Sequence, residues 1–510
     1  MTRADRFALV LSVVAVLAAY LVTVHVFERM AHIEDEMAYV WQAQAIAGGK
    51  LMLPSPPQPT SFLVPFVVDY NGERFGKYPL GWPALLAIGV RLGLRDWVNP
   101  LLAGLGVWLT YRLGKRAFGE TVGLLAAGLT VISPFFLINS GSLLSHPFGL
   151  VLSAAFALAW LDAFGEIPSP RPWLATLVAG LTLGMMAQTR PLTAVAVGFP
   201  FALHGLYLLV RGSWDTRRRL VTVGVIALLM ALLVLLWQYA VTGNPRLNPY
   251  TLWWDYDKIG FGPGIGRITG GHTLNQAIIN TRASLYQGSF DLFGWMQYSW
   301  IFIPFGAIVA IRNLITRKLP VHTLLLASVF PSLVVFYLAY WVGAQLYGPR
   351  YYYEGLYSLT IFSGAGIALL AGWPTQPDEP WHTYTGWQRL RPLGLTAVLG
   401  VLVSITLWFA IPARVGGMYG LYDIKRSSLA PFQTSEAHQM TPALVIVHPQ
   451  EWTLYGAFLE LENAFLDTPF IFVFDRGPEV NAAVARAFPD RNVYHYYPDQ
   501  PEIFYTGPRP

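Results

Sequence analysis

The stretch "FALVLSVVAVLAAYLVTVHVFERMAHIEDEMAYV", residues 7–40, joins two kinds of sequence. Residues 7–27 form an apolar run long enough to cross the hydrocarbon core of a bilayer as one helix. Three acids in a row, Glu34, Asp35 and Glu36, follow at the point where the chain should leave the lipid. The stretch therefore predicts a spanning helix and then a second helix with an acidic first turn at the membrane surface.

The composition of the whole chain agrees with a membrane protein. Of its 510 residues, 54% are hydrophobic and only 12% are charged, whereas about a quarter are charged in a typical soluble domain. The net charge of +5 comes from basic residues that cluster between apolar runs, which is not the pattern of a nucleic-acid-binding face. The chain has no Cys, which excludes disulfides and Cys-ligated metals.

Apolar runs of spanning length recur along the sequence. The segment 79–93 is shorter and contains two prolines, so it is ambiguous. Treating it as an interfacial or re-entrant helix leaves eleven spans and puts the basic segments 111–116, 211–219 and 312–318 on one side with the N-terminus, which is the cytoplasmic side by the positive-inside rule. The predicted spans are 7–27, 98–116, 120–138, 147–165, 173–189, 191–210, 219–241, 290–311, 321–342, 353–372 and 392–411.

This topology collects the long polar segments on the outer face. The largest are an outer loop at 28–97, a second at 242–289 and the tail from residue 412. In the tail, short apolar strands alternate with helical patterns at 451–467 and 478–488, which predicts a small α/β unit with a parallel sheet. We therefore expect a membrane domain at 1–411 and an extracytoplasmic α/β domain at 412–510 that leans on it, because so short a chain buries little core of its own.

Ionisable residues are rare in the predicted spans away from their ends. Transporters bind ions or protons near the bilayer midplane and need ionisable groups there, so this pattern disfavours a transporter or flippase. The ionisable residues gather on the outer face instead. That distribution favours chemistry at the membrane surface on a lipid-attached substrate.

The acidic stretch offers one candidate base. On a helix that begins near Asp35, residues Asp35, Tyr39 and Gln42 share one face, while Glu34 and Glu36 point elsewhere. The alternative is that all three acids only complement the helix dipole. Further polar residues predicted on the same side of the membrane are Asp69, Lys77, His146, Arg190, His272 and Arg350.

Three motifs carry a family resemblance. They are "EDEMAYVWQAQAIAGG" at 34–49, "NGERFGKYPLGWP" at 71–83 and "VWLTYRLGKRAFGETVGLLAAGLTVISPFFL" at 107–137. In order and spacing they resemble the polyprenyl-phosphate-sugar-dependent glycosyltransferases of the GT-C fold, in the protein O-mannosyltransferase and aminoarabinose transferase branch. The chain departs from the family with "KYPL" at 77–80 in place of a double proline, and with "SHP" at 145–147 where relatives carry an acid.

The resemblance implies a catalytic Asp at Asp35, with Glu36 beside it, and a phosphate-contacting Lys at Lys77. Arg350 is a second expected phosphate ligand or an interfacial anchor, and Arg190 is a third ligand or a helix–loop hydrogen-bond donor. No cofactor is required, although His146 and His272 could hold a divalent metal with Asp35. The other residues expected to line the site are Tyr39, Gln42, Asp69, His146, His272 and Tyr351.

Transfer of a sugar from a lipid phosphate needs a base on the acceptor and cations on the phosphate, but no strong acid, whereas a glycosidase needs a close carboxylate pair. We therefore expect an inverting enzyme at the outer face of the plasma membrane that moves a sugar from a polyprenyl phosphate to a hydroxyl of a glycan, lipid or protein. The alternative is a ligase or polymerase of lipid-linked glycans with a polyprenyl-diphosphate donor. The glycine-rich stretch 259–272 lacks a nucleotide-binding motif and predicts a mobile outer loop over the site.

Overall fold

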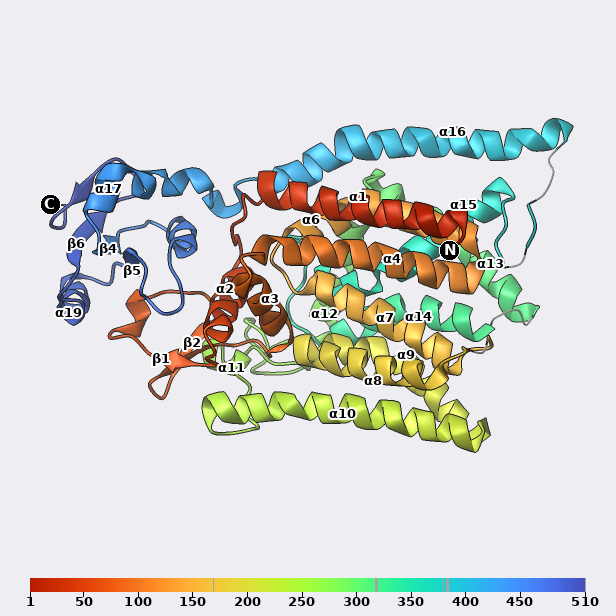
Figure 1. Cartoon of the computed structure of the whole chain (residues 1–510), viewed down its shortest axis with the longest axis horizontal. Helices are drawn as coiled ribbons and strands as arrows, with labels where there is room; N and C mark the ends of the chain where they lie inside the picture. Colours follow the sequence, from red (N-terminus) through yellow and green to blue (C-terminus); the bar gives the residue numbers. More distant parts are fainter. Residues whose placement is uncertain (168, 317–319, 378, 382–384, 510) are drawn as a thin grey trace.

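The computed structural model describes residues 1–167, 169–316, 320–377, 379–381 and 385–509. Long helices lie side by side along the long axis of the molecule, and shorter helices and two small sheets occupy one end (Figure 1). Arg317 and Lys318 of the basic segment 312–318 lie outside the described residues.

Eight helical stretches in the described part of the chain are long and apolar enough to cross a membrane, or nine with a bent pair counted as one span. This number is smaller than the eleven expected, although each predicted span overlaps a helix, and the span at 290–311 overlaps α13 (Ile303–Ile315) only from Ile303. The eight stretches and the bent pair account for nine of the eleven predicted spans. The other two predicted spans, α4 (Val98–Phe118) and α8 (Pro172–Thr189), are helices but are not among those eight. The eight are α1 (Arg3–His25), α7 (His146–Phe164), α9 (Pro191–Arg211), α10 (Trp214–Thr242), Met296–Ile315 with α13 (Ile303–Ile315), α14 (Pro320–Tyr337), Arg350–Ala371 with α15 (Leu356–Ala371), and Gly386–Asp423 with α16 (Leu390–Ile405).

The bent pair is α5 (Glu120–Ile132) and α6 (Pro134–Gly141), which meet at 61°. Pro134 has no backbone N–H to continue the first helix and is well suited to begin the second. Ser133 caps the new helix, because its hydroxyl accepts a hydrogen bond from the backbone N–H of Phe136 at 3.3 Å. The predicted span at 120–138 is therefore two helices.

The elements of the segments predicted to be outer gather at one end of the bundle (Figure 1). Helix α2 (Glu34–Ala47) begins at the acidic stretch as expected, and α3 (Gly81–Arg91) is the short helix expected at 79–93. Between them, β1 (Leu53–Pro54), β2 (Val67–Tyr70) and β3 (Glu73–Gly76) form an antiparallel sheet in the order β1-β3-β2. The segment 242–289 contains α11 (Tyr250–Trp253) and most of α12 (Leu274–Asp291).

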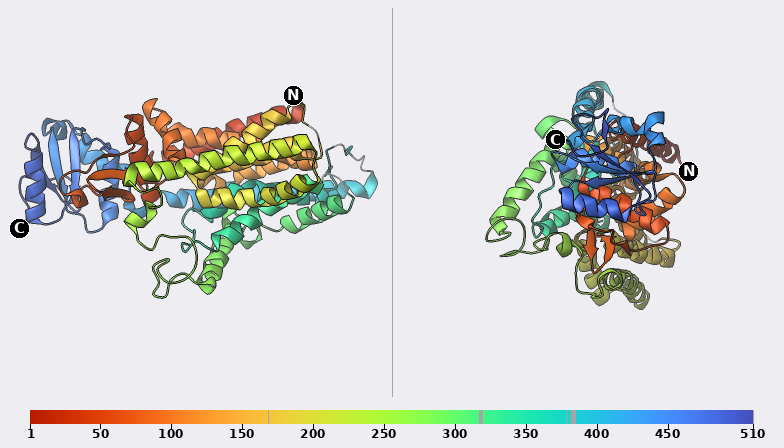
Figure 2. Two further views of the ribbon diagram at one scale, coloured as in Figure 1. Left: turned by 90° about the horizontal axis from the view of Figure 1, so that it is seen from below. Right: turned by 90° about the vertical axis from the view of Figure 1, so that its left-hand side faces the viewer.

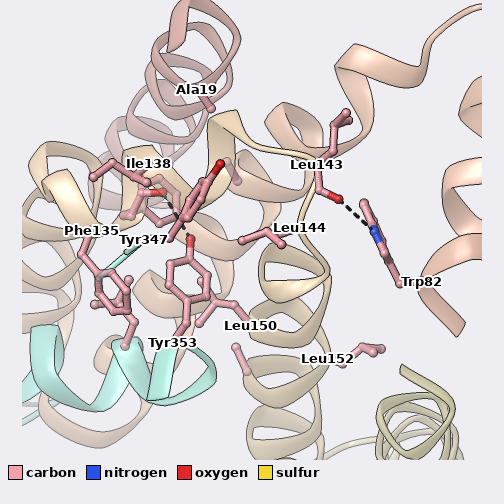
Figure 3. Close-up of a cluster of buried hydrophobic side chains, with 14 of the residues drawn as sticks. Ala19, Trp82, Phe135, Ile138, Leu143, Leu144, Leu150, Leu152, Tyr347 and Tyr353 are labelled. Carbon is pink, nitrogen blue, oxygen red and sulfur yellow. Dashed lines mark hydrogen bonds between the residues drawn. The ribbon is translucent and has the colours of Figure 1, made fainter. Parts of the chain in front are cut away.

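Buried packing fixes α3 against the helix bundle. The indole N–H of Trp82 on α3 donates to the carbonyl of Leu143 at 3.1 Å, just before α7 (Figure 3). Around this bond, buried side chains of α1, α6, α7 and the segment 347–353 pack together (Figure 3). Close packing of this kind leaves little freedom for the loops that carry the polar residues.

The C-terminal unit contains the predicted parallel sheet. Its strand order is β5-β4-β6-β7, with β4 parallel to β5 and β6, and β7 antiparallel to β6. The helical pattern expected over 451–467 extends only to Glu460, because α18 is followed by one tight 3-10 turn. The elements are α17 (Ser435–Gln439), β4 (Ala443–Val447), α18 (Trp452–Gly456), β5 (Phe470–Phe474), α19 (Pro478–Ala487), β6 (Asn492–Tyr496) and β7 (Phe504–Tyr505).

The C-terminal unit covers the end of the helix bundle that carries α2, α3 and the β1-β3-β2 sheet (Figure 2). Arg95 makes a two-pronged contact with Glu460, at 3.0 and 2.9 Å. The side chain of Gln44 on α2 accepts a hydrogen bond from the backbone of Ala464 at 3.0 Å. The unit therefore packs against α2 and the loop before α4, as the sequence predicted from its small size.

Candidate active site

The start of α2 is fixed by Glu36 and not by Asp35. One carboxylate oxygen of Glu36 accepts hydrogen bonds from the backbone N–H groups of His32 at 2.8 Å and Ile33 at 3.2 Å. The other accepts one from the backbone N–H of Leu143 at 2.8 Å. Glu36 is completely buried. It therefore satisfies the free donors of the helix terminus and ties α2 to the segment before α7.

A cavity of about 470 Å³ opens beside α2. Its walls come from α2, the turn at 77–79, the α8–α9 junction, α10, the segment 248–267, the segment 337–342 and residues 350–351. This volume lies in the range of about 300–1,000 Å³ that small-molecule sites occupy. Of the predicted site residues, Asp35, Tyr39, Lys77, Arg190, Arg350 and Tyr351 line this cavity.

Asp35 is bonded through both oxygens. The Tyr78 hydroxyl donates to its Oδ1 at 2.5 Å, and Arg350 Nη2 donates to its Oδ2 at 3.2 Å. Burial by itself would raise the pKa of Asp35, but the charge of Arg350, the Tyr78 hydroxyl and two further cations of the cavity hold it below its ordinary value. Asp35 is therefore an ionised carboxylate at neutral pH.

Tyr39 and Gln42, predicted to share a face of α2 with Asp35, lie near Tyr78. Tyr39, one turn after Asp35, lies in the cavity wall, and its ring is 4.5 Å from that of Tyr78. Gln42 follows on the same face and donates to the backbone carbonyl of Tyr78 at 2.7 Å. Gln42 thus lies behind the cavity and positions the residue that bonds Asp35.

Lys77 is an enclosed cation. Its ammonium is 3.1 Å from Oδ2 of Asp257 and 3.5 Å from the centroid of the Phe66 ring. Burial lowers the pKa of Lys77, and the neighbouring Asp257 opposes that change. Asp257 was not among the residues predicted from the sequence.

The two arginines differ in how fully they are bonded. Arg190 lies 3.3 Å from Glu354 and donates to the hydroxyls of Ser145 at 3.2 Å and Tyr337 at 3.3 Å. Arg350 contacts Asp35, but its buried Nη1 has no hydrogen-bond partner among the described residues. Arg350 therefore has a donor to offer to a ligand, while Arg190 is largely used by the protein.

Besides Glu36 and Gln42, three further predicted site residues do not line the cavity. Asp69 is exposed on the β2–β3 hairpin and accepts a hydrogen bond from Ser55 at 2.8 Å. His146 is buried at the start of α7, 3.2 Å from Glu354. His272 lies 2.9 Å from the carbonyl of Leu338.

The optional metal site of His146, His272 and Asp35 is not assembled. Among the residues that the structure describes, no three His, Asp or Glu side chains are grouped so that they could hold a metal ion. His146 faces Glu354 and His272 faces a backbone carbonyl, so neither shares a contact with Asp35. The donor set expected for a divalent metal is therefore not brought together.

Other cavity residues were missed or misplaced in the sequence prediction. Glu34 lines the cavity beside Asp35, although the helical wheel pointed it away. Side chains on the first turn lean towards the helix N-terminus, so neighbouring positions can reach the same opening. Arg267, in the glycine-rich stretch 259–272, also lines the cavity and lies 4.6 Å from the Trp254 ring. The aromatic and acidic run "YTLWWDYDK" at 250–258 was the available signal for Tyr250 and Asp257.

Comparisons with known proteins bear on this geometry. Residues 81–237 match the family of dolichyl-phosphate-mannose-protein mannosyltransferases. ArnT from Cupriavidus metallidurans, solved with undecaprenyl phosphate bound, superposes with a TM-score of 0.57 at 15% identity, over 95% of this chain and 89% of that one. This chain has the GT-C fold.

A second GT-C protein agrees. The oligosaccharyltransferase of Archaeoglobus fulgidus in its apo form superposes with a TM-score of 0.54 at 12% identity, over 96% of this chain and 69% of that one. No curated protein sequence matches the chain. The resemblance predicted from the sequence is thus confirmed at the level of the fold, and the long apolar helices agree with a multi-pass membrane protein.

The family match begins at Gly81 of this GT-C chain. Asp35, Lys77 and Arg350 lie outside the matched residues, while Arg190 lies inside them. Their roles therefore depend on the cavity geometry.

Proposed function

We propose that this GT-C protein is an inverting glycosyltransferase that moves a sugar from a polyprenyl phosphate to an acceptor hydroxyl, with Asp35 as the general base. The observation that carries the proposal is the contact between Asp35 and Arg350 inside the cavity. It joins an ionised carboxylate to a cation with an unused donor. A base and a phosphate ligand are the two groups that this transfer requires.

The proposed transfer conserves charge between Asp35 and the donor phosphate. The acceptor oxygen bonds the anomeric carbon from the face opposite the phosphate, and the bond from that carbon to the phosphate oxygen breaks. The acceptor proton passes to Asp35, and the electron pair of the broken bond stays on the phosphate. Asp35 loses one negative charge while the phosphate changes from a diester monoanion to a monoester dianion, so the charge beside Arg350 is conserved.

Arg350 is suited to follow that charge. One of its terminal nitrogens already bonds Asp35, and the other is buried without a partner among the described residues, so a rotation of the guanidinium would bring it to the phosphate. As the proton reaches Asp35, the guanidinium can strengthen its bond to the phosphate without moving far. Interactions that tighten during the reaction lower its barrier, whereas those equal in both states do not.

The remaining cations would hold the donor. Lys77 presents a point charge at one side of the cavity, and Arg190 lies at the α8–α9 junction on another. The apolar side chains of Val234 and Trp237 on α10 offer a wall for the first isoprene units of the lipid. ArnT, the fold relative solved with undecaprenyl phosphate, supports this donor class.

One observation favours a second candidate function. Arg267 adds a fourth cation to the cavity wall, which suits a donor with two phosphates. A ligase or polymerase of lipid-linked glycans would use such a polyprenyl-diphosphate donor. Competition between polyprenyl phosphate and polyprenyl diphosphate for the cavity separates the two candidates, because the proposed transferase binds the monophosphate at least as tightly.

A structure of the protein with polyprenyl phosphate tests the proposal. We expect the phosphate within hydrogen-bonding distance of Arg350 and Lys77, with its first isoprene units along α10. A phosphate bound away from both residues would contradict the assignment. The outer face of the plasma membrane, which the sequence predicts for this site, is tested separately by labelling Cys introduced at position 50 from outside intact cells.

A further inference from the structure

The surroundings of Lys77 are unusual for a charged side chain. Only 3% of it is exposed, and four aromatic rings surround its ammonium within 6 Å of their centroids. The nearest are those of Phe66 at 3.5 Å and Tyr250 at 4.8 Å. Ring faces attract a cation, but they do not replace water for a full charge. A lysine in this setting needs a counter-ion to remain protonated.

Asp257 is that counter-ion. It is 3% exposed, and its Oδ2 lies 3.1 Å from the Lys77 ammonium. Its Oδ1 accepts hydrogen bonds from the indole of Trp341 at 3.1 Å and the hydroxyl of Tyr340 at 3.3 Å. Because one oxygen is held by the segment after α14, the other is fixed on Lys77.

The other charged groups around Lys77 have different partners. From α2, Asp35 is bonded to Arg350 and Tyr78, and Glu34 makes no ion pair with Lys77 among the described residues. The cations Arg190, Arg267 and Arg350 line the same cavity and would disfavour a further positive charge there. Asp257 is therefore the carboxylate that stabilises the charged form of Lys77 by direct contact.

We propose that Asp257 is a positioning residue that keeps Lys77 protonated and directed into the cavity before the donor phosphate binds. The proposal rests on the proposed function, because it makes Lys77 a phosphate ligand. Burial lowers the pKa of Lys77, and contact with Asp257 is the main opposing influence. Donor binding then takes up no proton at Lys77, and the phosphate finds a cation already formed.

Removing the Asp257 charge predicts a specific change in pH dependence. In Asp257→Asn, Lys77 would be neutral in the donor-free protein, so phosphate binding would have to take up one proton. Linkage then weakens binding by about tenfold for each pH unit above the new pKa of Lys77. A merely structural role for Asp257 would weaken binding by the same factor at every pH.

The experiment measures the Kd of polyprenyl phosphate in detergent micelles between about pH 7 and pH 9, above the second pKa of the phosphate itself. We expect a Kd that does not change with pH for the unmodified protein and a Kd that rises steeply with pH for Asp257→Asn. Calorimetry should show that only Asp257→Asn takes up a proton at Lys77 when the phosphate binds. Asp257→Glu should restore the flat profile. The double variant Asp257→Asn with Lys77→Arg should also be flat, because a guanidinium keeps its proton. A flat profile for Asp257→Asn alone would overturn the proposal.

A ligand-free measurement separates this inference from the proposed function. The loss of thermal stability in Asp257→Asn should shrink as the pH rises, because at low pH the variant buries an unpaired charge and at high pH it does not. If no form of the protein binds polyprenyl phosphate but this loss shrinks with pH, the proposed function fails and the role of Asp257 stands. A loss that is constant with pH would refute that role directly.

Discussion

Substitution of Arg350 probes the shared contact between base and phosphate. Arg350→Ala removes the cation 3.2 Å from Asp35 and the unused donor that we assign to the donor phosphate. One charge-assisted hydrogen bond contributes about 1.5–3 kcal/mol, which predicts a fall in kcat/KM of about 10- to 150-fold. Arg350→Lys keeps the charge but loses the fork, so its loss should be smaller.

The same substitution should also change the pH profile. Arg350 is the leading influence that holds the pKa of Asp35 below its ordinary value, and without it burial would raise that pKa. Asp35 can act as a base only when ionised, so activity in Arg350→Ala should be lost at a higher pH as the medium is acidified. The unmodified enzyme should keep its activity to lower pH.

Initial rates of sugar transfer between pH 5 and pH 8 test both effects. This pH range begins about one unit above the ordinary pKa of a carboxyl group. Arg95→Ala is a matched control. Like Arg350, Arg95 is an arginine bonded to a carboxylate, that of Glu460, but it does not line the cavity. The control should keep its pH profile. An Arg350→Ala protein that is folded, fully active and unchanged in its pH profile would refute the reasoning and make Arg350 an anchor.

Three further predictions address neighbouring residues. Lys77→Ala should reduce kcat/KM for the lipid-linked donor by about 10- to 150-fold, the same 1.5–3 kcal/mol contact, in a protein whose thermal melt shows it is folded. Glu36→Gln should destabilise the protein by about 1–3 kcal/mol through weakened caps at a fully buried position, yet leave turnover per folded molecule close to normal; a selective loss of turnover would give Glu36 a direct role. Tyr78→Phe removes the hydroxyl 2.5 Å from Asp35, so it should raise the pKa of Asp35 and slow transfer by about 3- to 10-fold, and an unchanged rate at all pH values would show that this bond is idle.

Much of the fold was predictable because it depends on local pattern. The apolar runs identified the helices, and the helical spacing grouped Asp35 with Tyr39, which both line the cavity, although Gln42 lies behind it. The parallel order of the C-terminal strands followed from alternating strands and helices. The number of spans was less predictable, because Pro134 divides one apolar run into two helices and because α4 and α8 are not among the stretches long and apolar enough to cross a membrane.

The partners of the site residues could not be predicted. Lys77 contacts Asp257, which is 180 residues away in the sequence, and Asp35 contacts Arg350, which is 315 residues away. Local spacing in the sequence therefore does not predict these contacts. The sequence placed Glu36 beside Asp35, but it could not show that the Glu36 carboxylate accepts a hydrogen bond from the backbone of Leu143. His146 looked available to a metal but is paired with Glu354 from another helix. Charged residues on one face are readable from sequence, whereas their pairing depends on how distant helices pack.

The central claim is that Asp35 takes the proton of the acceptor. Asp35→Asn keeps the shape of the side chain and can still accept a hydrogen bond from Tyr78 or Arg350 at its one amide oxygen, but it is too weak a base to accept the proton. The decisive measurement is single-turnover sugar transfer from a purified lipid-linked donor, with donor affinity measured on the same samples and Glu34→Gln as the matched variant from the same cavity wall. The account predicts that Asp35→Asn slows transfer by about 10² or more with nearly unchanged donor affinity, while Glu34→Gln retains most of its rate. Equal transfer rates in both variants would contradict it and leave the acids as the start of a helix.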